Sequence, residues 1–313
     1  MKVVGYKNIM KIQILMSTYN GEQYIRTQLD SIVAQTVANK TLLIRDDGST
    51  DNTINIIREY QAQYPWITLL TEKNVGVQKS FFNLIKLADE EADFISFADQ
   101  DDQWLPEKLQ KAVERLNLFP SSSPVLYCGD KIIVGKNLED IPVTVGREVR
   151  KATFGNALVQ NICTGCTAVI NQALLTLLKK HLPKNQSAIV MHDWWLYLTA
   201  TCFGDVYYDQ EAFIRYRQHG NNASGAMLNR RALIKYRLSQ LLKPRGEIYR
   251  QIKEFRTAFR GNIGSRNEAM IFKILRSERC LGARIALICD RRIFRQKKSD
   301  DLVFRGIVLI GKL

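Results

Sequence analysis

Three carboxylates fall within four residues at Asp99, Asp101 and Asp102, with Gln100 between the first two. An apolar run at 94–98 precedes them and predicts a buried strand, and open α/β sheets place their chemistry at strand ends. Like charges packed this closely repel one another unless a cation neutralises them. An all-oxygen set suits Mg2+ or Mn2+, which are usually shared with substrate phosphates. The stretch therefore indicates a metal site for a nucleotide diphosphate, and the alternative is a solvated acidic turn that caps the next helix.

Two earlier polar turns also follow apolar runs. Thr18, Tyr19 and Asn20 come after the run at 11–16, and the pair Asp46 and Asp47 comes after a second run. Between the runs the apolar spacing is helical, which predicts parallel strands with right-handed crossovers and a crevice at their carboxyl ends. Both the dinucleotide fingerprint and the Walker phosphate loop are absent from the sequence. The pattern predicts a nucleotide site in which a metal replaces a glycine-rich loop.

Further along the chain, Asp193 precedes Trp194 and Trp195 at a predicted helix start. A carboxylate beside two indole rings can act as a base next to a sugar-stacking surface, whereas the alternative is a helix cap followed by core aromatics. Gly165 and Cys166 precede a predicted strand at 167–170. Small residues there allow close approach of a sugar, and they equally suit simple packing.

The net charge of +14 is concentrated at one end of the chain of 313 residues. Residues 1–225 carry 23 Lys and Arg against 24 Asp and Glu, whereas residues 226–313 carry 22 against 7. This contrast predicts a boundary near Gly225 and a basic helical C-terminal region. Such a region can bind an anionic membrane, a nucleic acid or an acidic partner. The alternatives are a solvated basic face, or helices packed on the catalytic domain or on a second subunit of a homo-oligomer.

The cysteines and the apolar runs bear on the cellular compartment. Six scattered cysteines show no disulfide framework, and the CxxC spacing at 163–166 has no second half-site, so a buried reduced pair is favoured over zinc or redox chemistry. Neither a signal peptide nor a membrane-spanning run is visible. We expect a cytoplasmic protein, peripheral at the inner face of the plasma membrane.

The three polar motifs together identify a family resemblance. Residues 16–21, 46–51 and 99–102 resemble, in order and spacing, the signature of inverting glycosyltransferase family 2. The resemblance covers about residues 10–225 and implies the GT-A fold, a Rossmann-like, mainly parallel sheet with helices on both faces. It implies a nucleotide-sugar half at about 10–120 and an acceptor half at about 121–225. The basic helical region at 226–313 lies outside it.

The resemblance also implies residue roles. Asp193 would be the general base, at a position where Glu-Asp is common and where this chain has His192 before the aspartate. Mn2+ or Mg2+ would be bound by Asp99, Asp101 and His219. The nucleotide-sugar would contact Thr18, Tyr19, Asn20, Asp46, Asp47, Asp99, Gln100, Asp102 and Arg217, and the acceptor would contact Gly165, Cys166, Trp194 and Trp195.

A narrower resemblance concerns the substrates. The sequences around Asp99, Asp193 and His219 are most similar to bacterial rhamnosyltransferases of cell-surface polysaccharide synthesis. This implies dTDP-L-rhamnose as donor and a lipid-linked or polysaccharide acceptor. The alternatives are a hexosyl or N-acetylhexosaminyl transferase that uses a UDP-sugar, and a basic nucleic-acid-binding protein. No nucleic acid is expected as a partner, because few aromatic residues accompany the cations of the C-terminal region.

Overall fold

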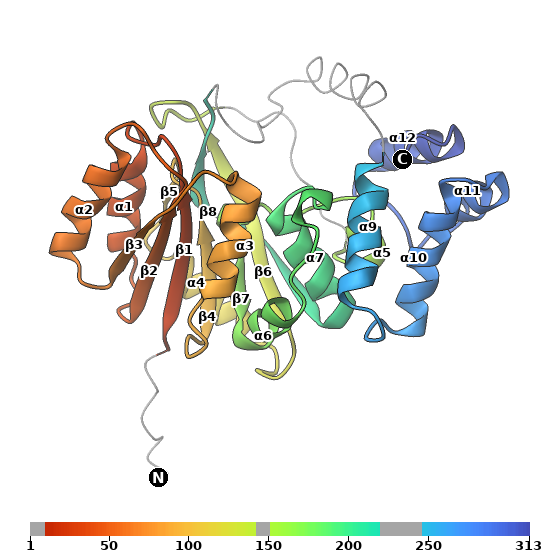
Figure 1. Ribbon diagram of the computed structural model, residues 1–313, viewed down its shortest axis with the longest axis horizontal. Helices are drawn as coiled ribbons and strands as arrows, with labels where there is room; N and C mark the ends of the chain where they lie inside the picture. The colour runs from red at the N-terminus through yellow and green to blue at the C-terminus, as the bar shows by residue number, and fades with distance from the viewer. Residues whose placement is uncertain (1–9, 142–150, 220–245) are drawn as a thin grey trace, which may run out of the picture.

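The computed structural model describes residues 10–141, 151–219 and 246–313 (Figure 1). The sheet order in this part of the chain is β3-β2-β1-β4-β7-β6-β8-β5. The strands are β1 Ile12–Thr18, β2 Lys40–Asp46, β3 Ile67–Thr71, β4 Phe94–Ala98, β5 Gln103–Trp104, β6 Val125–Val134, β7 Val169–Asn171 and β8 Asp205–Arg217. The helices are α1 Ile25–Val33, α2 Thr53–Gln63, α3 Val77–Leu87, α4 Lys108–Leu116, α5 Phe154–Ala157, α6 Gln172–Lys180, α7 His192–Phe203, α9 Glu247–Ala258, α10 Ser265–Ser277, α11 Leu281–Ile288 and α12 Lys298–Leu309.

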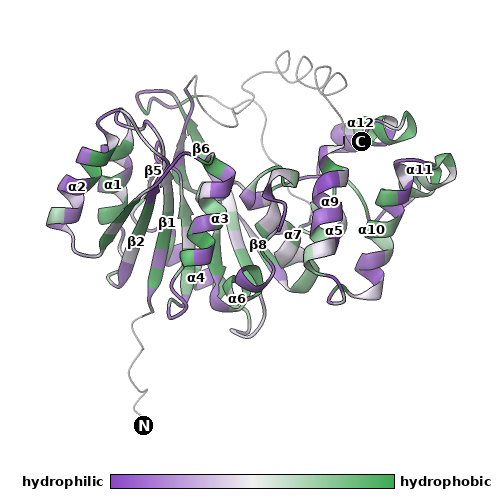
Figure 2. Cartoon of the chain, viewed as in Figure 1, coloured by the Kyte–Doolittle hydropathy of each residue, from purple (hydrophilic) through white to green (hydrophobic). Residues whose placement is uncertain are grey.

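The first four strands form the predicted parallel unit. β1 lies between β2 and β4, and the register pairs Thr18 with Asp46, so both polar turns begin at one edge of the sheet. Successive side chains of β1 point to opposite faces: Leu15 joins one hydrophobic core, and Ile14 and Met16 join the other. Because both faces are covered by helices, the strands consist of nearly continuous apolar residues, as Figure 2 shows.

The second half extends the same sheet with mixed directions. β7 pairs antiparallel with β4, and β6 pairs parallel with β8. The strand predicted at 167–170 begins two residues later, because Gly165–Thr167 form a 3-10 turn, η1, closed by a bond from the Ala168 N–H to the Gly165 carbonyl. This turn places Cys166 close to the end of β4.

The C-terminal helices share a core with the sheet-covering helix α7. The ring of Trp195 in α7 lies 5.3 Å from that of Phe255 and 6.1 Å from that of Phe259, and all three side chains are buried. Thus α9 packs against α7, one of the helices that cover the sheet (Figure 1). The predicted boundary near Gly225 lies outside the described residues. Among the helices that the structure describes, none has the length and apolar character needed to span a bilayer.

Candidate active site

The turns after β1 and β2 are held together by Asp46. Its carboxylate accepts hydrogen bonds from the Thr18 hydroxyl at 2.9 Å, from the Gly48 and Ser49 N–H groups, and from the Ser49 hydroxyl. These four donors fill the acceptor capacity of the two oxygens. Asp46, which is predicted to contact the nucleotide, thus accepts protein donors at both carboxylate oxygens.

Asp47 is likewise fully occupied. It forms a buried ion pair with Arg45 and accepts from the N–H groups of Val75 and Gly76 at the start of α3. Arg45 and Asp47 are 3% and 2% exposed, so solvent screens this pair very little. The predicted nucleotide contact of Asp47 would require one of these bonds to be given up. The carboxylate instead fixes the loop that leads into α3.

Gln100 and Asn20 attach the turn after β1 to its neighbours. The Gln100 side chain accepts from the Tyr19 N–H at 2.8 Å and donates to the Tyr19 carbonyl at 3.0 Å. Asn20, in the left-handed region at φ 47°, accepts from the Thr50 N–H at 2.8 Å. Gly21 leaves the space that Gln100 fills, because a Cβ there would lie 2.4 Å from Oε1. The Tyr19 side chain remains 47% exposed and is free to meet a ligand.

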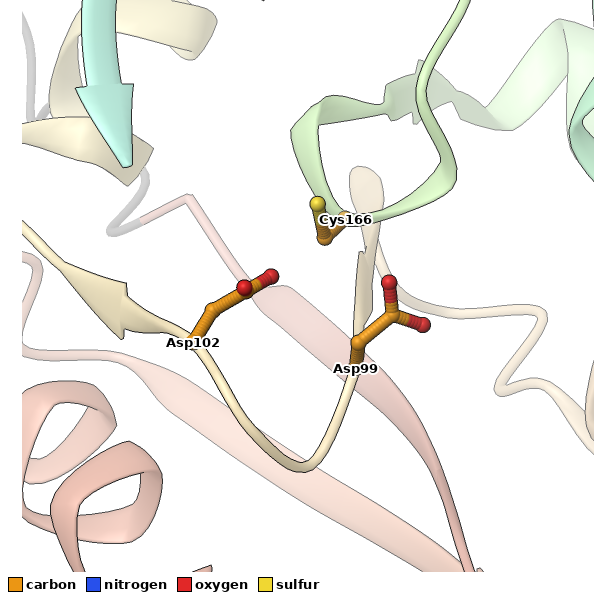
Figure 3. A group of neighbouring side chains, drawn as sticks. All are labelled: Asp99, Asp102 and Cys166. Carbon is orange, nitrogen blue, oxygen red and sulfur yellow. The ribbon is translucent and has the colours of Figure 1, made fainter. Parts of the chain in front are cut away.

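The carboxylates predicted as a metal motif divide into two groups. Asp99 and Asp102 stand on the two arms of the turn between β4 and β5, and Cys166 faces them from η1 (Figure 3). One ligand atom from each of these three side chains lies within 4.8 Å of the others. Asp101 is not a member of this group, and its Oδ2 lies 2.7 Å from Nε2 of His219.

Burial controls the protonation of the first group. Loss of solvent raises the pKa of Asp102 to about 7, and the charge of Asp101 adds to this rise. The pKa of Asp99 is also raised well above its usual range, by desolvation and then by the charges of Asp102, Asp101 and Asp193. Oδ1 of Asp102 accepts from the Arg217 N–H at 3.1 Å, whereas the buried Oδ2 has no hydrogen-bond partner within the described residues.

The end of β8 brings the predicted residues Arg217 and His219 against Asp101. The Arg217 Nε donates to the Asp101 carbonyl at 2.6 Å, and its guanidinium lies 4.7 Å from the centre of the Tyr24 ring. The His219 ring stacks on the same Tyr24 ring, with 4.7 Å between the ring centroids. Two residues distant in sequence from the acidic turn are therefore fixed beside it.

The predicted base Asp193 lies in the first turn of α7 and is 9% exposed. Its oxygens accept from the Asn161 side-chain amide and the Gly165 N–H, each at 3.0 Å. Desolvation raises the pKa of Asp193 to about 6, although these N–H donors and the charge of Lys131 act in the opposite direction. A carboxylate of this basicity can accept a proton at neutral pH. Gly165, predicted on the acceptor side, holds the orientation of this carboxylate through its backbone N–H.

Trp195 is not part of an open sugar-stacking surface. Its side chain is fully buried against Phe255 and Phe259, so the alternative of a core aromatic applies to it. The reason is that the C-terminal helices cover this face of α7, which the local sequence does not reveal. Trp194 is half-buried, and its indole N–H donates to the Ala157 carbonyl at 2.6 Å.

Two further residues contribute to the site and were not predicted from the sequence. Lys131 in β6 donates to the Thr164 hydroxyl at 3.2 Å, and its charge partly offsets the rise in pKa of Asp99, Asp102 and Asp193. Tyr24 supports both Arg217 and His219. A lone lysine within a strand and a tyrosine at a helix start carry no motif, so only the fold reveals their place.

Comparison with known proteins identifies the family. A family model described as Glycosyl transferase family 2 matches residues 13–174, more than half of the chain. The chain belongs to glycosyl transferase family 2. This confirms the predicted family and the GT-A fold, and the protein is a glycosyltransferase.

Three related proteins illustrate the range of the family. The dTDP-rhamnosyl transferase RfbG of Shigella flexneri is 36% identical over 233 residues, which cover 70% of this chain and 77% of the relative. The Escherichia coli protein WfgD, named a UDP-Glc:alpha-D-GlcNAc-diphosphoundecaprenol beta-1,3-glucosyltransferase, is 30% identical over 192 residues, covering 60% of this chain and 68% of the relative. A solved mannosyltransferase of Pyrobaculum calidifontis, in complex with GDP-Man and Mn2+, has a TM-score of 0.50 at 15% identity, covering 97% of this chain and 76% of that one.

Proposed function

We propose that this glycosyltransferase moves L-rhamnose from dTDP-L-rhamnose to a hydroxyl of a lipid-linked or polysaccharide acceptor, with inversion at the anomeric carbon. The identity of 36% to a dTDP-rhamnosyl transferase supports the donor. The name of WfgD, which specifies a diphosphoundecaprenol acceptor, supports a lipid-linked acceptor. The mechanism rests on one observation in this chain, the buried, hydrogen-bonded carboxylate of Asp193.

Asp193 is the proposed general base. The acceptor hydroxyl gives its proton to the Asp193 carboxylate as its oxygen bonds to the anomeric carbon, and the bond from that carbon to the diphosphate breaks. One displacement of this kind inverts the configuration and needs no covalent intermediate. The N–H donors from Asn161 and Gly165 hold the carboxylate in one orientation before the acceptor arrives.

Asp99, Asp101 and His219 are the proposed ligands of Mn2+ or Mg2+. The residues fit such an ion, because crowded carboxylates with raised pKa values and an unpaired, buried Asp102 oxygen are all stabilised by a nearby cation. The bound ion would offset the negative charge of the departing diphosphate. Arg217 is already held beside Asp101 and adds a second positive charge at this end of the crevice.

The turns after β1 and β2 form the proposed nucleotide end of the donor site. The exposed ring of Tyr19 would contact the nucleobase of the donor. Thr18, Asn20 and Gln100 hold the turn in place. Asp46 and Asp47 shape these loops through their own hydrogen bonds. The donor would thus lie across the carboxyl ends of β1, β2 and β4, where open α/β sheets bind ligands.

The C-terminal helices are the proposed contact with an anionic membrane surface. They carry exposed apolar side chains, which include Phe272, Leu281, Ile285, Leu302 and Leu309. Arg276, Arg279 and Arg291 are exposed on the same helices and the connections between them. Apolar side chains interleaved with cations suit the interface of a bilayer that presents a lipid-linked acceptor.

Donor titration tests this proposal. We expect dTDP-L-rhamnose to bind the wild type in isothermal titration calorimetry, more tightly with Mn2+ than without it. Asp101→Asn should lose the dependence on Mn2+ while keeping its fold, as monitored by circular dichroism. UDP-glucose is the competing donor, because WfgD carries UDP-Glc in its name. Preferential binding of a UDP-sugar would keep the enzyme class and reject rhamnose as the transferred sugar.

A further inference from the structure

A groove lies between α9 and α10, which pack side by side in the C-terminal region (Figure 1). Two hollows of about 580 and 470 Å³ adjoin in this groove, because Lys253 and Leu275 line both of them. Two ion pairs cross it: Nζ of Lys253 lies 2.9 Å from Glu278, and Nε of Arg256 lies 2.5 Å from Glu268. Each hollow has the volume of a small-ligand site.

The groove carries an excess of positive charge. Five cations line the two hollows: Lys253, Arg256, Arg260, Arg276 and Arg279. The two glutamates of the groove are already paired with Lys253 and Arg256, so the three other arginines have no ion-pair partner among the residues that the structure describes. Arg260 lies in one hollow, and Arg276 and Arg279 lie in the other. Guanidinium groups gathered in this way attract an anion, and their geometry suits the paired oxygens of a phosphate.

Exposed apolar side chains border these cations. Phe272 of α10 is 49% exposed and lies one turn before Arg276, whose guanidinium is 5.5 Å from the centre of the Phe272 ring. Leu281 is 59% exposed and follows Cys280, which lines the second hollow. A soluble phosphate does not bury apolar side chains, whereas an anionic lipid presents its phosphate next to its acyl chains. The combination of cations and apolar side chains therefore favours a lipid.

We propose that the groove between α9 and α10 binds the phosphate of an anionic lipid headgroup, with Arg260, Arg276 and Arg279 as its ligands. This inference rests on the membrane contact in the proposed function and deepens it, because it assigns that contact to one saturable site. The guanidinium groups donate to the phosphate oxygens, while Phe272 and Leu281 enter the bilayer interface. The site is distinct from the proposed donor site, which is built from the turns after β1, β2 and β4.

Vesicle sedimentation tests the groove. We expect the protein to bind vesicles of phosphatidylglycerol mixed with phosphatidylcholine, and not vesicles of phosphatidylcholine alone. The double variant Arg260→Gln, Arg279→Gln should bind about tenfold or more weakly, because it removes one cation from each hollow.

The matched control is the double variant Arg266→Gln, Arg291→Gln. Both of these arginines are exposed in the same C-terminal region, and neither lines the groove. The control removes the same charge, and we expect its affinity for the vesicles to fall less than about threefold. Equal losses in the two double variants would show diffuse attraction by the whole basic surface and would overturn the site.

Soluble ligands separate the lipid from other sources of phosphate. Saturable binding of inorganic phosphate in the presence of a chelator, lost in Arg260→Gln, Arg279→Gln but without vesicle binding, would reject the lipid. Tighter binding of a random oligonucleotide than of the vesicles would do the same. Both double variants should bind dTDP-rhamnose like the wild type. Normal donor binding without vesicle binding would overturn the lipid site alone, whereas groove-dependent vesicle binding without donor binding would reject the proposed donor alone.

Discussion

The buried carboxylates of this glycosyltransferase lie in two regions that differ in the number of hydrogen bonds that the carboxylate oxygens accept. In the turn after β2, Asp46 and Asp47 each accept enough protein donors to fill both oxygens. At the end of β4, Asp102 keeps an unpartnered oxygen, and desolvation raises the pKa values of Asp99 and Asp102. The first region shapes loops, whereas the second contains carboxylates that the proposed metal ion would neutralise.

Burial alone therefore does not identify a reactive carboxylate. Asp46 and Asp102 are equally inaccessible to solvent, yet only Asp102 lacks a donor for one of its oxygens. Asp193 lies between these extremes, since two N–H donors orient it while desolvation still raises its pKa to about 6. What distinguishes the reactive groups is the number of protein donors that they receive.

Removal of the base should have the largest effect on catalysis. In Asp193→Asn we expect transfer to slow roughly 10²–10⁴-fold, because the amide cannot accept the acceptor's proton. Asparagine keeps an oxygen for the Gly165 N–H, so donor binding should be unchanged. Single-turnover rates and donor titration measure the two quantities. A parallel collapse of donor affinity would assign Asp193 to donor binding instead.

Loss of a satisfied carboxylate should mainly affect stability. Asp47→Asn leaves the charge of Arg45 buried without its counterion, and we expect the free energy of unfolding to fall by about 3 kcal/mol. Urea denaturation measures this. The exposed pair Arg26–Glu59 is the matched control, and Glu59→Gln should cost less than about 1 kcal/mol. Equal losses at both sites would remove the distinction between buried and exposed pairs.

The pH dependence should follow Asp193. Its pKa of about 6 means that the base is ionised at pH 7.5 and protonated below pH 6. We expect the transfer rate to fall about tenfold per pH unit on the acidic side of this value. Measurements in constant ionic strength, with donor at saturation, report the enzyme–substrate complex. A rate independent of pH between 5 and 7 would contradict the assignment.

Loss of an unsatisfied carboxylate should be mildly stabilising. The folded state raises the pKa of Asp102 to about 7, so its charged form is disfavoured and stability declines as pH rises toward that value. With a chelator present, Asp102→Asn should therefore gain stability relative to the wild type as the pH rises, by on the order of 2–3 kcal/mol between pH 5 and pH 8. Urea denaturation at both pH values tests this. Destabilisation of the variant at pH 8 would show that Asp102, like Asp46 and Asp47, stabilises the fold in its charged form.

The sequence was sufficient to predict the alternation of strands and helices up to the acidic turn, because apolar runs and helical spacing are local properties. It also placed Asp193 at a helix start and Asp99 at a strand end, both of which the structure shows. It did not reveal that Asp46 and Asp102 differ in their hydrogen bonding, because the number of donors around a carboxylate depends on segments distant in sequence. The burial of Trp195 was missed for the same reason, since Phe255 and Phe259 lie about 60 residues further along.

The packing of Phe255 and Phe259 on Trp195 links the C-terminal helix α9 to α7, the helix that carries Asp193. Trp195 lies two residues after Asp193 on the same helix, so the apolar contacts that hold α9 also hold the segment that carries the base. A chain shortened before α9 would expose this aromatic face to water and loosen the start of α7. The C-terminal helices therefore support the helix that carries the proposed base, whatever surface their outer side contacts.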